Sequence, residues 1–180
     1  GVRNGRVVRP HGIYCHAAIL LLSGLPLLAS ATAAVAQGGP VTVAVSEQRF
    51  AAHIAEASQR FGIPEAWIRA IIIAESAHDI GAISSAGAMG LMQVMPDTWA
   101  DLRVQHRLGA DPHDPRDNIL AGTAYLRQMF DRYGSIGAML SAYNAGPGRY
   151  DEYVATGRPL PAETRAYVGK LAPILGGEPL

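Results

Sequence analysis

The chain has 180 residues, enough for one domain with its own core and too few for two of ordinary size. Lys plus Arg equals Asp plus Glu at 15 each, so the formal net charge is zero. Lys170 is the only lysine and no basic stripe occurs, which argues against a nucleic-acid-binding protein.

The first 36 residues are typical of an export signal. Three arginines precede an apolar stretch at 17–29, and Ala34–Ala36 supplies a small-residue cleavage site. The apolar stretch is short and contains Gly24 and Pro26, which favours a cleaved signal over a membrane anchor. We expect a signal peptide at 1–36, a linker at 37–45, a single folded domain at 46–176 and a tail at 177–180.

Removal of the signal would change both charge and cysteine content. The remainder has twelve basic and fifteen acidic residues, and Cys15, the only cysteine, lies inside the signal. The exported domain would therefore hold neither a disulfide nor a thiolate metal site, and its hydrophobic core must stabilise it.

The first half of the domain is predicted to hold two helices. Ser46 can cap a helix that runs to Phe61 and ends at Gly62. Pro64 opens a second helix that continues through Glu75. The Gly/Ser/Ala-rich stretch at 78–92 is expected to be a loop with short strand pairing.

The second half is predicted to be helical between turns. Helices are expected from Pro96 to His106, across 119–133, across 136–143 and across 164–175, with Asp117 as an N-cap. The third of these should break at 144–148, a stretch rich in glycine and proline. The pattern predicts a compact, mostly α domain with one irregular glycine-rich insert.

Glu75 is the outstanding candidate for chemistry. It follows Ile68, Ile71 and Ile72 at helical spacing, so its carboxyl group projects from an apolar face. Lost hydration there raises the pKa of a carboxyl group, as a general acid near neutral pH requires. A structural carboxylate that reaches a cap or an arginine fits the spacing equally well.

The string that starts at Glu75, ESAHDIGAISSAGAMGLMQVMPDTW, resembles the signature of the soluble lytic transglycosylase family. This is glycoside hydrolase family 23 of the lysozyme superfamily. The blocks NILAGTAYL, SAYNAGPG and LPAETRAYV follow in the family's order. The resemblance implies a mostly α, lysozyme-like α+β fold, with helices around a substrate cleft and a small irregular strand region.

The resemblance also implies a set of residues around the substrate. Glu75 would be catalytic, and the substrate-binding candidates are Ser84, Gly87, Met92, Gln93, Tyr143, Asn144, Glu163 and Tyr167. Several have a plain structural alternative: Gly87 in an ordinary turn, Met92 as core filler, Tyr143 as a helix-end core aromatic, Asn144 as a cap and Glu163 as a first-turn carboxylate.

Two features depart from the family pattern. Asp79-Ile80 stands where Asn-Pro is usual, and His78 stands where an aromatic or aliphatic residue is commoner. Asp79 is therefore a possible second carboxylate for hydrolysis. The polar residues His106, Asp111, His113, Asp114 and Asp117 fit no zinc or calcium spacing, and we interpret them as a solvated loop and cap.

The function that the resemblance implies is cleavage of the β-1,4 bond between N-acetylmuramic acid and N-acetylglucosamine in peptidoglycan. Glu75 would act first as acid and then as base, leaving a 1,6-anhydro end, with no metal and no cofactor. The expected setting is the periplasm or cell envelope, as a monomer on glycan strands, with type IV secretion or conjugation components as candidate partners. The alternatives are a hydrolytic lysozyme that uses Asp79 or Asp97, and a non-catalytic glycan-binding scaffold.

Overall fold

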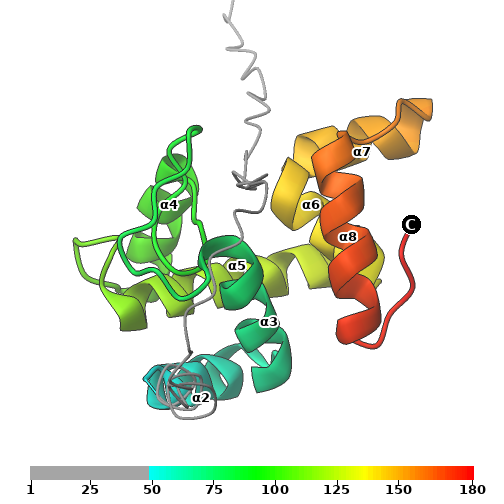
Figure 1. The fold of residues 1–180 in the computed structure, drawn as a ribbon. Coiled ribbons are helices and arrows are strands. Elements are labelled where there is room, and N and C mark those ends of the chain that lie inside the picture. Colours follow the sequence, from blue (N-terminus) through cyan, green and yellow to red (C-terminus); the bar gives the residue numbers. More distant parts are fainter. Residues whose placement is uncertain (1–48) are drawn as a thin grey trace, which may run out of the picture.

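The computed structural model describes residues 49–180 (Figure 1). The predicted signal peptide, linker and Ser46 cap lie outside this range. The described part is mostly helical, and its elements are α2 (Ala51–Phe61), α3 (Glu65–Ser76), α4 (Pro96–His106), α5 (Pro115–Tyr133), α6 (Ile136–Ala145), α7 (Pro147–Thr156) and α8 (Ala162–Ile174). None of these helices is both long and apolar enough to cross a membrane.

The core is built around α5, which passes through the middle of the molecule (Figure 1). Ile119, Leu120 and Leu126 on this helix are fully buried, and α2, α4 and α6 all pack against it. Buried side chains occupy most sides of the first half of α5. A helix that is apolar on most sides has to be enclosed by other elements, which explains its central place.

The helix ends that position Glu75 follow the predicted signals. Gly62 ends α2 with a φ of +65°, a left-handed conformation that glycine adopts without steric cost. Pro64 precedes α3, and the apolar stripe of α3 buries Ile68 and Ile71. The second predicted helix is thus confirmed, with Glu75 in its last turn.

The glycine-rich segment after α3 folds into two short extended pairings, as predicted. Met89 pairs with both Ile83 and Val94 through antiparallel bridges. The buried Asn118 of α5 holds this segment: its Oδ1 accepts from Met92 N at 2.8 Å, and its Nδ2 donates to Met89 O at 3.0 Å and Pro112 O at 2.8 Å. One buried amide therefore fixes the path of a segment that contains little regular structure.

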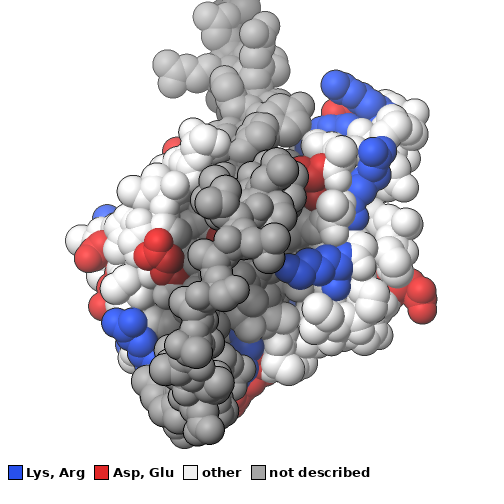
Figure 2. Space-filling view, in the orientation of Figure 1, with Lys and Arg blue, Asp and Glu red and all other residues white. Residues whose placement is uncertain are grey.

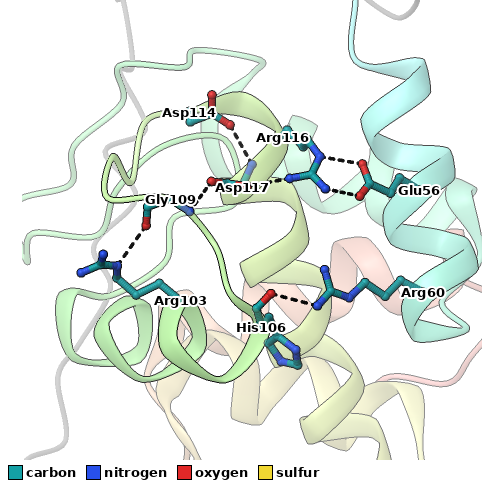
Figure 3. A network of polar contacts seen from close by, with 8 residues as sticks. All are labelled: Glu56, Arg60, Arg103, His106, Gly109, Asp114, Arg116 and Asp117. Carbon is teal, nitrogen blue, oxygen red and sulfur yellow. Dashed lines mark hydrogen bonds and ion pairs between the residues drawn. The ribbon is translucent and has the colours of Figure 1, made fainter.

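A polar network ties the loop before α5 to α2 and α4 (Figure 3). Arg116 grips both carboxylate oxygens of Glu56, and Asp117 accepts from Gly109 N at 2.6 Å. Two predictions need correction. Asp114, not Asp117, is the N-cap of α5, because Pro115 occupies the first turn. Asp117 is also buried rather than solvated.

The C-terminal third contains a helix that the sequence analysis missed. The predicted break at 144–148 is in fact the single residue Gly146, with a φ of +85°, and Pro147 starts α7 directly. Proline is well suited to a first helical turn, so the Gly-Pro pair joins two helices here. The last helix starts at Ala162, two residues earlier than predicted. The predicted tail, 177–180, lies against the start of α6.

Candidate active site

Glu75 lines a cavity of about 50 Å³. The cavity is formed by the last turn of α3, the end of the glycine-rich segment, and the helices α4, α5 and α6. Its lining consists of Glu75, Gln93, Val94, Met95, Thr98, Tyr125, Tyr143, Asn144 and Gly146. Five helices or segments that lie far apart in the sequence thus converge on one carboxyl group.

The pKa of Glu75 is raised from 4.5 to about 7. Burial is the main cause, because loss of hydration disfavours the carboxylate form. The hydrogen bond from Tyr167 lowers the pKa, and the negative charge of Glu163 raises it. The raised pKa that the apolar helix face predicted is confirmed. A carboxyl group with this pKa can both donate and accept a proton near neutral pH.

Helix α8 brings two predicted residues to Glu75. Tyr167 donates a hydrogen bond of 2.7 Å to Glu75 Oε1, across 92 residues of sequence. Glu163 lies one turn earlier in α8, close enough for its charge to affect the pKa of Glu75. Both residues therefore act on the carboxyl group itself.

The backbone turns sharply just after Glu75. Ala77 and His78 both have positive φ, at 49° and 70°, a backbone conformation that residues other than glycine rarely adopt. Ser76 holds this turn, since its Oγ donates to Ile72 O at 3.1 Å and to Leu91 O at 2.9 Å. The end of α3 is thereby fixed to the glycine-rich segment.

Two tyrosines form one wall of the cavity. The rings of Tyr125 and Tyr143 lie 5.4 Å apart at 49°, and Tyr143 donates to Met92 O at 2.8 Å. Burial raises the pKa of Tyr125 to about 12, so this hydroxyl stays protonated. Tyr143 was predicted from sequence, but Tyr125 was not. It stands in the block NILAGTAYL, which supported the family resemblance but supplied no candidate site residue.

Amide side chains complete the lining. Gln93 has a φ of +48°, and its Nε2 donates to Gly90 O at 2.9 Å and to Ala82 O at 3.2 Å. Asn144 Oδ1 accepts from Thr164 of α8 at 2.8 Å. Both amides are therefore held rigidly, and both line the cavity as predicted candidates.

Five predicted substrate-binding residues do not line this cavity: Glu163 and Tyr167, which act on Glu75 from α8, and Ser84, Gly87 and Met92. Ser84 accepts from Ala88 N at 2.9 Å, and Gly87 forms the adjacent turn with a φ of +87°. Met92 is fully buried, packed on Gly122, so its side chain belongs to the core and not to the cleft wall. The reason is the glycine at position 122. A Cβ there would lie 2.5 Å from the Met92 Cβ, so the absence of a side chain at this position allows Met92 to pack against α5.

Asp79, the predicted rival carboxylate, is exposed and does not line the cavity. Its Oδ1 accepts from Gly81 N at 2.9 Å and so caps a turn. Asp97 lies elsewhere, in a wider hollow of about 410 Å³ that shares Met95, Thr98, Tyr125 and Gly146 with the Glu75 cavity. The two spaces together form one cleft along α4 and α5. Within residues 49–180, no group of three or more His, Cys, Asp or Glu is placed to hold a metal ion.

Residues 52–163 match the family model described as the transglycosylase SLT domain. The chain belongs to this family. A transglycosylase of Enterobacteria phage PRD1 is 33% identical over 118 residues, which cover 66% of this chain and 40% of the phage protein. Membrane-bound lytic murein transglycosylase C of Haemophilus influenzae is 38% identical over 120 residues, covering 59% of this chain and 34% of that protein. The chain thus spans two fifths or less of the length of these relatives.

Solved structures support the same assignment. The 70-kDa soluble lytic transglycosylase in complex with bulgecin A is 28% identical, with a TM-score of 0.64 over 72% of this chain and 24% of that one. An inactive Glu-to-Gln mutant of the lytic transglycosylase Slt from Pseudomonas aeruginosa is 30% identical, with a TM-score of 0.63 over 71% and 23%. The SLT domain described here therefore has the lysozyme-like fold predicted from its sequence.

Proposed function

We propose that this SLT domain cleaves the β-1,4 bond between N-acetylmuramic acid and N-acetylglucosamine in peptidoglycan. The observation that carries the proposal is Glu75, a carboxyl group with a pKa of about 7 that lines the cavity. The relatives are named lytic transglycosylases, one of them a lytic murein transglycosylase, and these names indicate murein, that is peptidoglycan, as the substrate class.

The proposed reaction uses Glu75 twice. Its protonated form donates a proton to the glycosidic oxygen as the bond from that oxygen to C1 of the muramic acid breaks. The resulting oxocarbenium-like centre is attacked by the same sugar's 6-hydroxyl oxygen, and the hydroxyl proton passes to the Glu75 carboxylate. The enzyme returns to its starting state, no water is consumed, and the product has a 1,6-anhydro end.

One carboxyl group suffices for this route because the acid and base steps follow each other on the same side chain. Hydrolysis of the usual kind needs a second carboxylate about 5–10 Å away across the bond. Among carboxylates, Glu163 is the one whose charge affects the pKa of Glu75, whereas Asp79 caps a turn outside the cavity. These observations favour transglycosylation over hydrolysis.

Hydrolysis remains the second candidate because Asp97 lines the wider part of the cleft. A water positioned there by Asp97 would give a reducing end in place of an anhydro end. A non-catalytic scaffold is disfavoured. Burial of an ionisable carboxyl group lowers the stability of the fold, and glycan binding alone gives no reason to keep such a group in the cavity.

The setting of the reaction follows from its substrate. We propose a place in the bacterial cell envelope, since a relative is described as membrane-bound and acts on murein. The cleaved signal, the monomeric state and a role beside a type IV secretion or conjugation apparatus stay predictions from sequence.

The test of the proposed catalytic role is Glu75→Gln in a peptidoglycan-clearing assay. The amide keeps the size of the side chain but cannot supply the proton, so activity should fall at least about a thousandfold. Glu178→Gln, an exposed change of the same kind, should leave activity unchanged. Equal clearing by the Glu75→Gln and parent proteins, with both folded by circular dichroism, would contradict the proposal.

A further inference from the structure

A second hollow of about 200 Å³ lies on the other side of α8 from Glu75. We call it the rear pocket. It lies between α6, α7, the loop before α8, α8 itself and the C-terminal residues, and its main lining residues are Tyr153, Leu160, Arg165, Val168 and Leu180. None of these residues lines the cleft that contains Glu75.

The two sites use different faces of α8. Tyr167 and Glu163 act on Glu75, while Arg165 and Val168 line the rear pocket. Successive residues in an α-helix are about 100° apart, so Arg165 and Val168 lie away from the line that joins Glu163 and Tyr167. A ligand in the rear pocket would therefore leave the cleft open to a glycan strand.

The walls of the rear pocket are apolar. Leu160 and Val168 are buried, and Leu180 is 56% exposed beside them. Burial of apolar surface is the main source of affinity for such a hollow, and its volume suits one or two aliphatic side chains rather than a sugar ring with its hydroxyl shell.

The polar groups of the rear pocket favour an anion. Arg165 is exposed and makes no side-chain ion pair or hydrogen bond within residues 49–180, and the Tyr153 hydroxyl has no hydrogen bond there either. Figure 2 shows further Lys and Arg side chains over α7 and α8. Arg158, in the loop after α7, pairs with Glu152 at 2.9 Å, so Arg165 is the cation that the pocket offers to an anion. A guanidinium group pairs with a carboxylate through two parallel hydrogen bonds, and a phenol can donate a third.

We propose that the rear pocket binds the carboxyl-terminal residue of a partner polypeptide that ends in an aliphatic amino acid. The aliphatic side chain enters between Leu160 and Val168, and the terminal carboxylate pairs with Arg165 and accepts from the Tyr153 hydroxyl. Capture of a terminal carboxylate is a recurring mode of peptide recognition, and here a guanidinium group and a phenol would bind the charge. The pocket thus gives this domain an attachment point for a partner protein that is separate from its cleft.

The test uses the tripeptide Gly-Gly-Leu and isotope-labelled chain observed by NMR. The free acid should shift the backbone amides of 157–168 in a saturable manner, and its C-terminal amide should bind about tenfold more weakly, since it lacks the charge. Perturbation centred on Glu75 and Tyr143, or equal binding of acid and amide, would overturn the proposal.

Matched variants separate the pocket from general charge. Arg165→Gln should weaken binding of Gly-Gly-Leu about tenfold, whereas Lys170→Gln, an equal charge change on the same helix outside the pocket, should not. Both variants should retain peptidoglycan cleavage, because neither residue lines the cleft. Equal weakening by both would contradict a specific site, and so would tighter binding of octanoate than of the peptide, which would indicate an acyl-chain site.

Discussion

Tyr167 donates a 2.7 Å hydrogen bond to Oε1 of Glu75, and this contact joins the last helix of the domain to the candidate catalytic acid. The bond stabilises the carboxylate form and so opposes the effect of burial. Glu163, one turn earlier on the same helix, acts in the other direction through its negative charge. Helix α8 therefore carries one residue that lowers the pKa of Glu75 and one that raises it.

Tyr167→Phe should raise the pKa of Glu75 above 7, because the bond that favours the carboxylate is lost. Since the first step needs protonated Glu75, the alkaline limb of the kcat/KM profile should move to higher pH, by about half to one pH unit. Tyr153→Phe, which removes a hydroxyl outside the cleft, is the control and should leave the limb in place. An unmoved or lowered limb in Tyr167→Phe would contradict this assignment.

Glu163→Gln should move the same limb in the opposite direction. Removal of the negative charge makes ionisation of Glu75 easier, so its pKa falls and activity is lost at a lower pH. The pH dependence of kcat/KM for Glu163→Gln and for Glu178→Gln gives the comparison. A shift in both variants, or in neither, would show that Glu163 does not act on Glu75 through its charge.

The pKa of Glu75 also predicts how stability depends on pH. The folded protein holds this proton up to about pH 7, whereas the unfolded chain releases it near 4.5, so the free energy of unfolding should fall as the pH rises between these values. The loss is on the order of 3 kcal/mol. It should be absent in Glu75→Gln, which titrates no group at this position.

Urea unfolding at pH 4 and at pH 8 measures this difference. The free energy of unfolding of Glu75→Gln minus that of the parent should be higher at pH 8 than at pH 4. The increase should roughly equal the stability that the parent loses through Glu75. Parallel changes in the two proteins would show that the pKa of Glu75 is not raised in the folded state.

The path of the glycine-rich segment depends on glycine at position 90. Its φ is +72°, and a Cβ there would lie 2.5 Å from Asn118 Nδ2, so Gly90→Ala would combine backbone strain with disruption of the buried amide. Gly87 has a similar φ of +87°, but a Cβ there would meet only Pro96 Cγ, at an ordinary contact distance of 4.0 Å. Thermal unfolding should show a loss of about 1 kcal/mol for Gly87→Ala and at least twice that for Gly90→Ala. Equal losses would mean that the contact with Asn118 is unimportant.

The sequence predicted those features that depend on spacing within one element. Glu75 follows Ile71 and Ile72 on one helix, so its position on an apolar face and its raised pKa could be expected. Likewise Gly62 marked a helix end through its own conformational freedom. Local chemistry was sufficient for these predictions because an apolar helix face and the conformational freedom of glycine are properties of a single element.

Features that depend on distant packing could not be derived in this way. The bond between Tyr167 and Glu75 needs α8 to fold back against α3, and no local pattern encodes that contact. Met92 shows the opposite error. The family signature that starts at Glu75 suggested that Met92 lines the cleft, but Met92 packs into the core against Gly122, which has no side chain. α7 was missed because a Gly-Pro pair that joins two helices has the same sequence as one that ends a helix.

The measurement that tests the central claim most directly is mass analysis of the fragments released from purified peptidoglycan by the parent protein. Transfer to the 6-hydroxyl predicts muropeptides that end in 1,6-anhydro-muramic acid, each lighter by one water than the hydrolysis product and resistant to reduction by borohydride. Fragments with reducible muramic ends would contradict this mechanism and would favour hydrolysis with a second carboxylate such as Asp97.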